Sequence, residues 1–217
     1  MLISQIYKNY NIPPGLQLHM YRVTGVAFII CNHFNEGIDR NTILSTCFLH
    51  DMGNIIKFNF DLLPELFEEK GIEYWKQVQQ EFIKKYGNDE HTATRKIAEE
   101  IGVSKKIIDI LENLGFSKAR QIFFSTDYNL KISSYADQRV SIKGIVPMEE
   151  RHREGRTRYL KRSDLKSDKS VEKFEKRAVW MQKLEKQIFG KTDISPTFIT
   201  DDAVNKQISN FYDYEIV

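Results

Sequence analysis

The chain has 217 residues, of which 41% are hydrophobic and 29% are charged, as in an ordinary globular protein with one sizeable core. Its formal net charge of +2 is too small to argue for nucleic-acid binding from charge alone. No run approaches the ~18 apolar residues of a membrane helix, and no basic start precedes an apolar block, so we expect a cytoplasmic protein without a membrane partner.

The first strongly patterned segment predicts a helix over Leu16 to Phe34, directly after the stop at Pro13-Pro14-Gly15. Its apolar residues recur at helical spacing and predict one buried face, which His19 shares. A histidine there is more often a core side chain bonded to a backbone carbonyl than a ligand. Arg22 follows one turn later, which is unusual company for a structural histidine because buried guanidinium groups need partners.

A second helix is expected to run to about Asp51, with Asp39 or Asn41 as its cap and Gly53 just beyond its end. It closes on an adjacent imidazole and carboxylate, His50 and Asp51. Such a pair offers one neutral nitrogen and one anionic oxygen to a single divalent cation. Neighbours of this kind are also common without a metal, so the interpretation depends on what else the chain supplies.

Further cationic and imidazole side chains follow in the middle of the chain. Lys57, in an apolar segment, is either a snorkelling surface lysine or a phosphate contact. A helix over Glu90 to Ile101, capped by Asn88 or Asp89, places His91 and Arg95 along one face. Helical segments are also expected from Pro64 to Tyr86, with a break at Gly71, and from Ser104 to Leu114.

A second inward-facing carboxylate is expected at residue 137. Ile122 to Ser125 is interpreted as a buried helical or extended linker, and a helix follows it. Asp137 lies in that helix among apolar residues, where a carboxylate must be paired, hydrogen-bonded or metal-bound. Arg139 is an awkward partner for it, because side chains two positions apart on a helix point away from each other.

The C-terminal part begins with a basic run over residues 151–162. Most such runs are solvated faces, but this one could also form an electropositive rim that attracts phosphorylated substrates or RNA. A long amphipathic helix is expected over Ser170 to Gly190, and the tail after it packs back on the body. Cys31 and Cys47 both lie in apolar helical patterns, which favours buried thiols over a disulfide.

The chain offers two imidazoles and two carboxylates on inward-facing positions: His19, His50, Asp51 and Asp137. Such a set suits a hard-to-borderline divalent ion, and the lack of cysteine in it argues against a thiolate-built zinc site. Their order and local context resemble the HD-domain family of metal-dependent phosphohydrolases. The resemblance spans about residues 16 to 140 and rests on Leu18 to Val23, Leu49 to Gly53 and Tyr135 to Val140. It implies the metal ligands His19, His50, Asp51 and Asp137.

The resemblance implies an all-α fold, a single-domain bundle of seven or eight helices around one metal pocket. The HD-like part would cover residues 1–145, and a basic loop and amphipathic helix over 146–217 would pack on it. Family members with two metals have more histidines than this chain offers, so we expect one divalent cation (Mn, Mg, Co, Ni, Fe or Zn). His91 would line the pocket or act as an outer ligand. The Glu that nucleotidase-like members carry after the His-Asp pair is absent, which disfavours the nucleoside-monophosphate phosphatases.

The implied activity is hydrolysis of a phosphate ester on a nucleotide or a related phosphorylated small molecule. Asp51 would orient or deprotonate the attacking water, with Arg22, Lys57 and His91 as further catalytic groups. Arg22, Lys57, Arg95 and Arg139 would hold the non-bridging oxygens of the substrate. The alternative is a regulatory module that binds a metal or nucleotide without turnover, since fold does not fix function. An RNA-binding role for the basic run and a homodimer are also left open.

Overall fold

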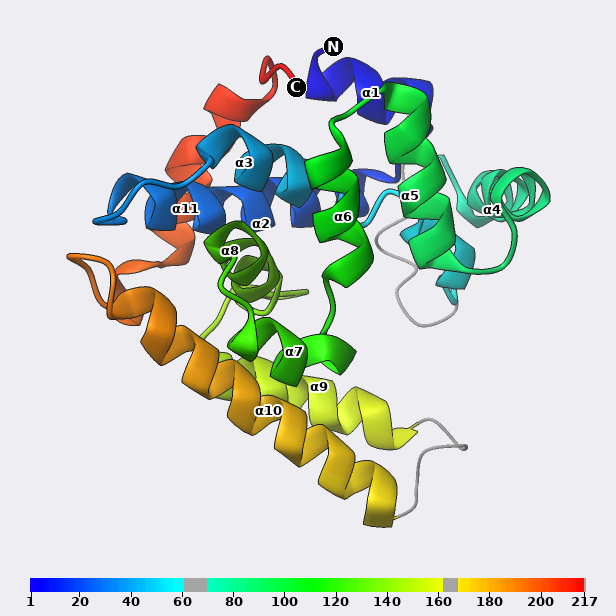
Figure 1. Ribbon diagram of the computed structural model, residues 1–217. Coiled ribbons are helices and arrows are strands. Elements are labelled where there is room, and N and C mark those ends of the chain that lie inside the picture. The colour runs from blue at the N-terminus through cyan, green and yellow to red at the C-terminus, as the bar shows by residue number, and fades with distance from the viewer. Residues whose placement is uncertain (61–69, 162–167, 217) are drawn as a thin grey trace.

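A computed structural model describes residues 1–60, 70–161 and 168–216, and these residues form an all-α body, as expected (Figure 1). In these ranges there are eleven α-helices and one two-stranded antiparallel ribbon. The helices are α1 Ile3–Asn9, α2 Pro14–Asn32, α3 Arg40–Leu49, α4 Ile72–Tyr86, α5 Glu90–Ile101, α6 Lys105–Asn113, α7 Ala119–Phe124, α8 Tyr128–Asp137, α9 Met148–Lys161, α10 Asp168–Phe189 and α11 Asp201–Ile208; the strands are β1 Val140–Ser141 and β2 Gly144–Ile145. None of the described helices has the length and apolar character to cross a bilayer.

The body is built around α2, which packs against α3, α8 and α11 (Figure 1). Pro14 begins α2, where the missing N–H of proline has no cost. Asp39 caps α3 by accepting a hydrogen bond from the Thr42 backbone N–H, 3.1 Å between N and Oδ1. Packing on α2 brings the C-terminal ends of α3 and α8 close to it. The predicted ligands lie at those two ends and on α2 itself.

The expected helix signals of the middle region are confirmed. The side chain of Asp89 accepts a hydrogen bond from Thr92 at the start of α5, and Ser104 accepts one from Ile107 at the start of α6. Gly102 ends α5 in the left-handed conformation, with φ of 83°. Both thiols are free, as expected: Cys47 is buried and Cys31 is partly buried. The expected helix start at Pro64 lies outside the described residues.

The bundle has more helices than the seven or eight expected. Helices α1 and α11 were not predicted, and the linker at Ile122 to Ser125 is α7 with its C-cap. The expected basic loop is wrong, because residues 148–161 form helix α9. Glu149 and Glu150 in its first turn favour a helix N-terminus. The helix has so few apolar residues, however, that the sequence shows no helical period of hydrophobicity.

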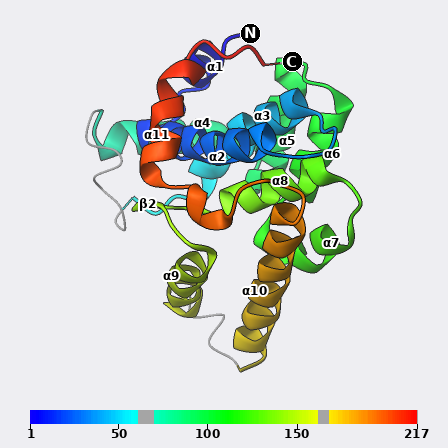
Figure 2. The ribbon, with the colours of Figure 1, turned by 90° about the vertical axis from the view of Figure 1, so that its left-hand side faces the viewer.

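The C-terminal part does more than pack on the outside of residues 1–145. Helix α11 packs against α2, and the Ile3 N–H bonds to the Tyr214 carbonyl, 2.9 Å, so the two ends of the described chain lie side by side (Figure 1). Helix α10 packs on α7 and α8, and together α9 and α10 extend away from the body (Figure 2). Residues from both ends of the sequence therefore share one core.

Gly53 allows a close approach between the His-Asp turn and α5. A Cβ atom at this position would lie 2.3 Å from the Glu90 carbonyl oxygen and 2.8 Å from the Ala93 Cβ. The Gly53 N–H also donates to the Thr94 hydroxyl, 2.9 Å. The backbone of Gly53 has φ of −89°, so the requirement is for space and not for an unusual conformation.

We therefore expect Gly53→Ala to lower the free energy of unfolding by about 1–3 kcal/mol, the usual cost of an extra group in a filled interior. Gly37→Ala is the matched control, because a Cβ at Gly37 has no heavy atom within 4 Å. Urea unfolding of the three proteins measures the difference. Equal midpoints for Gly53→Ala and Gly37→Ala would show that α5 can shift away at no cost.

Candidate metal centre

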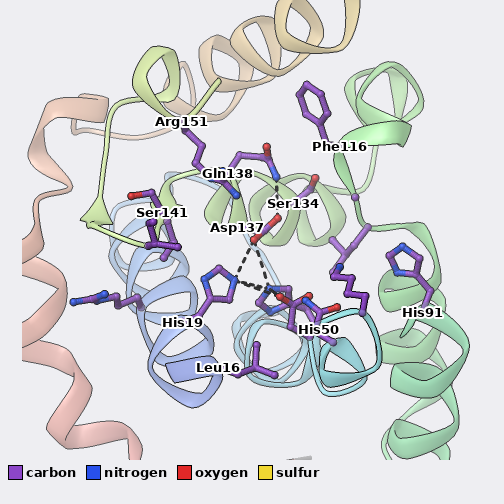
Figure 3. Close-up of a pocket in the computed structure, with 18 of the residues that line it drawn as sticks. Leu16, His19, His50, His91, Phe116, Ser134, Asp137, Gln138, Ser141 and Arg151 are labelled. Atoms are coloured by element: carbon purple, nitrogen blue, oxygen red, sulfur yellow. Dashed lines mark hydrogen bonds and ion pairs between the residues drawn. The ribbon is translucent and has the colours of Figure 1, made fainter. Parts of the chain in front are cut away.

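Four side chains from three parts of the fold converge at one point (Figure 3). His19 comes from α2, His50 and Asp51 directly follow α3, and Asp137 is the last residue of α8. The Nε2 atom of His19 lies 3.3 Å from His50 Nε2 and 3.3 Å from Asp137 Oδ1. The four sequence-predicted ligands are thus brought together.

Three further distances have the same size. His19 Nε2 lies 3.5 Å from Asp51 Oδ2, and His50 Nε2 lies 3.6 Å from both Asp51 Oδ2 and Asp137 Oδ1. Ligand atoms at ~2.0–2.2 Å from one cation are themselves ~3.0–3.6 Å apart in tetrahedral or octahedral coordination. The donors therefore fit a divalent cation by both chemistry and spacing, and His19, His50 and Asp51 form a group that could hold one.

The orientation of His50 suits a ligand. Its Nδ1 lies 2.8 Å from the carbonyl oxygen of Cys47, which can only accept a hydrogen bond. In the neutral ring Nδ1 therefore carries the hydrogen, and Nε2 presents its lone pair to the centre of the site. Gln138 Nε2 donates to Asp137 Oδ2, 2.8 Å, and so orients the second carboxylate. Hydrogen bonds of this kind commonly fix metal ligands in place.

The charges of the site favour a cation strongly. Burial lowers the pKa of His50, but Asp51 and Asp137 outweigh burial and raise that pKa to about 9. Burial raises the pKa of Asp137, yet hydrogen bonds from His19 and His50 hold it well below its usual range. A metal ion and the His50 proton compete for one nitrogen, so metal binding should strengthen as the pH rises towards 9.

The four side chains form one wall of a cavity of about 530 Å³. Arg22, Lys57 and His91, three of the predicted catalytic groups, also line it. The Nε atom of Arg22 is buried and has no hydrogen-bond partner among the described residues. Lys57 is half exposed and lies 3.3 Å from Glu90 Oε1, and His91 is 69% exposed. Arg22 is therefore the predicted cation most available to a ligand.

Two of the predicted substrate contacts are wrong. Arg95 pairs with the carboxylates of Glu99, 2.5 Å, and Glu112, 3.4 Å, and is not among the residues that line the cavity. Arg139 is 3% exposed and is also absent from the cavity wall. Its guanidinium donates to the Tyr135 hydroxyl and to the Val146, Pro196 and Ile199 carbonyls. These bonds satisfy the buried charge and tie α8 to the C-terminal part.

The cavity residues that were not predicted as single positions include Arg151 and Arg158 of α9, and Phe116, which follows α6. Arg151 reaches from α9 towards Gln138 and Ser141 (Figure 3). The sequence signal for the two arginines was the basic run over 151–162, through its interpretation as an electropositive rim. Which of the basic side chains point into the cavity could not be predicted without knowing that this run is helical.

Comparison of the chain with known protein families, with curated proteins and with solved structures found no match.

Proposed function

We propose that the protein is a metal-dependent phosphohydrolase that cleaves a phosphate ester of a nucleotide or a related small molecule. The observation that carries the proposal is the group of His19, His50 and Asp51, with Asp137 beside it, in one cavity with an arginine whose buried Nε has no hydrogen-bond partner among the described residues. The ligand order resembles that of the HD-domain family, which supports the same reaction class. Zinc-type structural sites of four thiolates or thiolates with histidines have a different donor set.

In this proposal His19, His50, Asp51 and Asp137 hold one divalent cation. When bound, the cation would act as a Lewis acid: it would lower the pKa of a water molecule and neutralise charge on a phosphoryl group. Arg22 donates hydrogen bonds to the non-bridging oxygens of that group, because a guanidinium fork matches their geometry. Asp51, 21% exposed to the cavity, orients the attacking water and accepts its proton.

The reaction is a hydrolysis of the ester bond. The oxygen of water forms a bond to phosphorus, the P–O bond to the alcohol breaks, and the alcohol oxygen takes up a proton. The products are the alcohol and inorganic phosphate. Lys57 and His91 lie at the exposed edge of the cavity. In this proposal they contact the leaving group or the part of the substrate farthest from the metal ligands.

The test begins with the metal content of the purified protein, which should be about one equivalent per chain. A panel of nucleoside phosphates, sugar phosphates and aryl phosphates is then assayed with the metal present and after chelation. We expect phosphate release that is lost on chelation and restored by the metal, with heavy oxygen from labelled water in the phosphate. A metal-replete protein that binds a nucleotide tightly but releases no phosphate would decide for the regulatory alternative.

A further inference from the structure

Helix α9 presents two arginines to the cavity from outside the metal-binding helices. Arg151 and Arg158 both line the cavity, and they are seven residues apart on one helix. Seven residues are close to two helical turns, so both side chains leave α9 on the same face. Arg156, on a different face, is paired instead with Glu175, 2.7 Å. The cavity-facing arginines are therefore a distinct pair within the basic run.

The position of this pair is fixed by packing. Arg139 Nε donates to the Val146 carbonyl, 2.7 Å, and so holds the segment that enters α9. His152 is 7% exposed and its ring lies 5.6 Å from that of Phe116, which in turn packs against Phe174 of α10. Because Arg151 directly precedes an anchored residue, packing fixes the part of the backbone from which its side chain reaches the cavity.

The hydrogen-bond donors on both sides of the cavity are incompletely used. The Nε atoms of Arg22 and Arg151 are each buried without a hydrogen-bond partner in the described part of the chain. The Glu154 carboxylate lies 3.9 Å from Arg151 Nη1, an ion-pair distance that is too long for a hydrogen bond. Buried donors of this kind are costly unless something satisfies them, so both point to an anionic ligand.

The charges that line the cavity indicate how much negative charge it can take. Its carboxylates are Asp51 and Asp137, which one divalent cation would neutralise. Lys57 is offset by Glu90, 3.3 Å away. The remaining cationic groups are the guanidinium groups of Arg22, Arg151 and Arg158, and the Glu154 carboxylate, 3.9 Å from Arg151 Nη1, offsets part of their charge. A phosphomonoester carries about two negative charges near neutral pH. A second phosphoryl group would bring further anionic oxygens to the guanidinium groups of α9.

We propose that Arg151 and Arg158 form a second anion subsite, which binds a second phosphoryl group of the substrate and makes the cavity selective for a diphosphate over a monophosphate. The proposal rests on the proposed function for the first phosphoryl group, which is held at the metal ligands and Arg22. The phosphoryl group bonded to the alcohol lies at the metal ligands and the second lies against α9, so cleavage of the P–O bond to the alcohol releases the alcohol and a diphosphate. The two arginines are specificity determinants that act through the substrate and leave the metal ligands untouched.

Inorganic pyrophosphate and inorganic phosphate are the probes, and calorimetry on the metal-loaded full chain measures their binding. The wild-type protein should prefer pyrophosphate by about tenfold or more, the usual effect of a further charge-assisted contact. Arg151→Gln and Arg158→Gln should each weaken pyrophosphate binding by about tenfold and phosphate binding by less than about threefold. Arg153→Gln is the matched control, an exposed arginine of α9 outside the cavity wall, and should change neither.

Arg158 is exposed, so Arg158→Gln keeps the test valid if Arg151→Gln does not fold. Equal binding of the two probes by wild-type protein, or equal losses for both probes in the variants, would overturn the second subsite. The binding readout separates this inference from the proposed function. Selective loss of pyrophosphate in a protein that hydrolyses nothing supports the subsite and refutes the hydrolase. Hydrolysis of monophosphates and matched diphosphates at ratios that both variants leave unchanged refutes the subsite alone.

Discussion

Asp51→Ala should abolish stoichiometric metal binding and remove the stabilisation that the metal gives to the folded chain. Asp51 Oδ2 lies 3.5 Å and 3.6 Å from the two imidazole Nε2 atoms, so its loss leaves the two imidazoles with Asp137 as their one remaining carboxylate in the site. A ligand present at 100 times its Kd stabilises a protein by about 2.7 kcal/mol. In a chain of this size that corresponds to a rise in Tm of about 5–10 °C.

The measurement is the difference in Tm with and without added metal, taken separately for each variant, together with metal content by elemental analysis. This difference cancels any effect of the substitution on the metal-free fold. His91→Ala is one control, because His91 is 69% exposed at the cavity and should leave the metal bound while reducing turnover. Asp109→Ala, at an exposed carboxylate of α6, is the other. An unchanged metal content in Asp51→Ala would mean that the site is misassigned.

The features that sequence predicted well are those with a local physical cause. Asp39, Asp89 and Ser104 cap helices because a short polar side chain can reach the free N–H groups one turn later. His19 and Asp137 were placed inward because they share the spacing of buried apolar neighbours. Their meeting with His50 depends on how three helices pack, which periodicity does not encode; the resemblance to a known family supplied that step.

The wrong predictions have a different cause: a long side chain can bind groups that lie far away in the sequence. Arg139 lies two residues after a predicted ligand, yet its guanidinium turns away from the cavity to carbonyls of Val146, Pro196 and Ile199. No pattern around residue 139 shows that the tail returns to this place. Arg151 illustrates the converse, because its basic neighbours resemble a solvated surface until the helix and the anchoring of His152 are known.

Arg22→Ala should lower kcat/KM for the phosphorylated substrate by well over tenfold while leaving the metal in place. Removing one partner of a buried charged contact commonly costs ~2–5 kcal/mol, and ~1.4 kcal/mol already corresponds to tenfold. Arg22 follows His19 by one turn of α2, lines the same cavity and has a buried Nε without a partner among the described residues. A phosphoryl group between the metal ligands and this guanidinium would satisfy that donor.

Steady-state kinetics and metal analysis on the same preparations measure the effect. Arg22→Lys keeps the charge but loses the paired donors of the guanidinium, so it should recover only part of the lost kcat/KM. Arg120→Ala, at an exposed arginine of α7 outside the cavity, should behave as wild type. Full activity in Arg22→Ala would show that the buried guanidinium is structural, and the first phosphoryl group would then have to be held by the cations of α9 and by Lys57. If Arg22→Ala instead lost the metal, Arg22 would support the metal ligand His19 on α2, and its assignment as a substrate contact would be wrong.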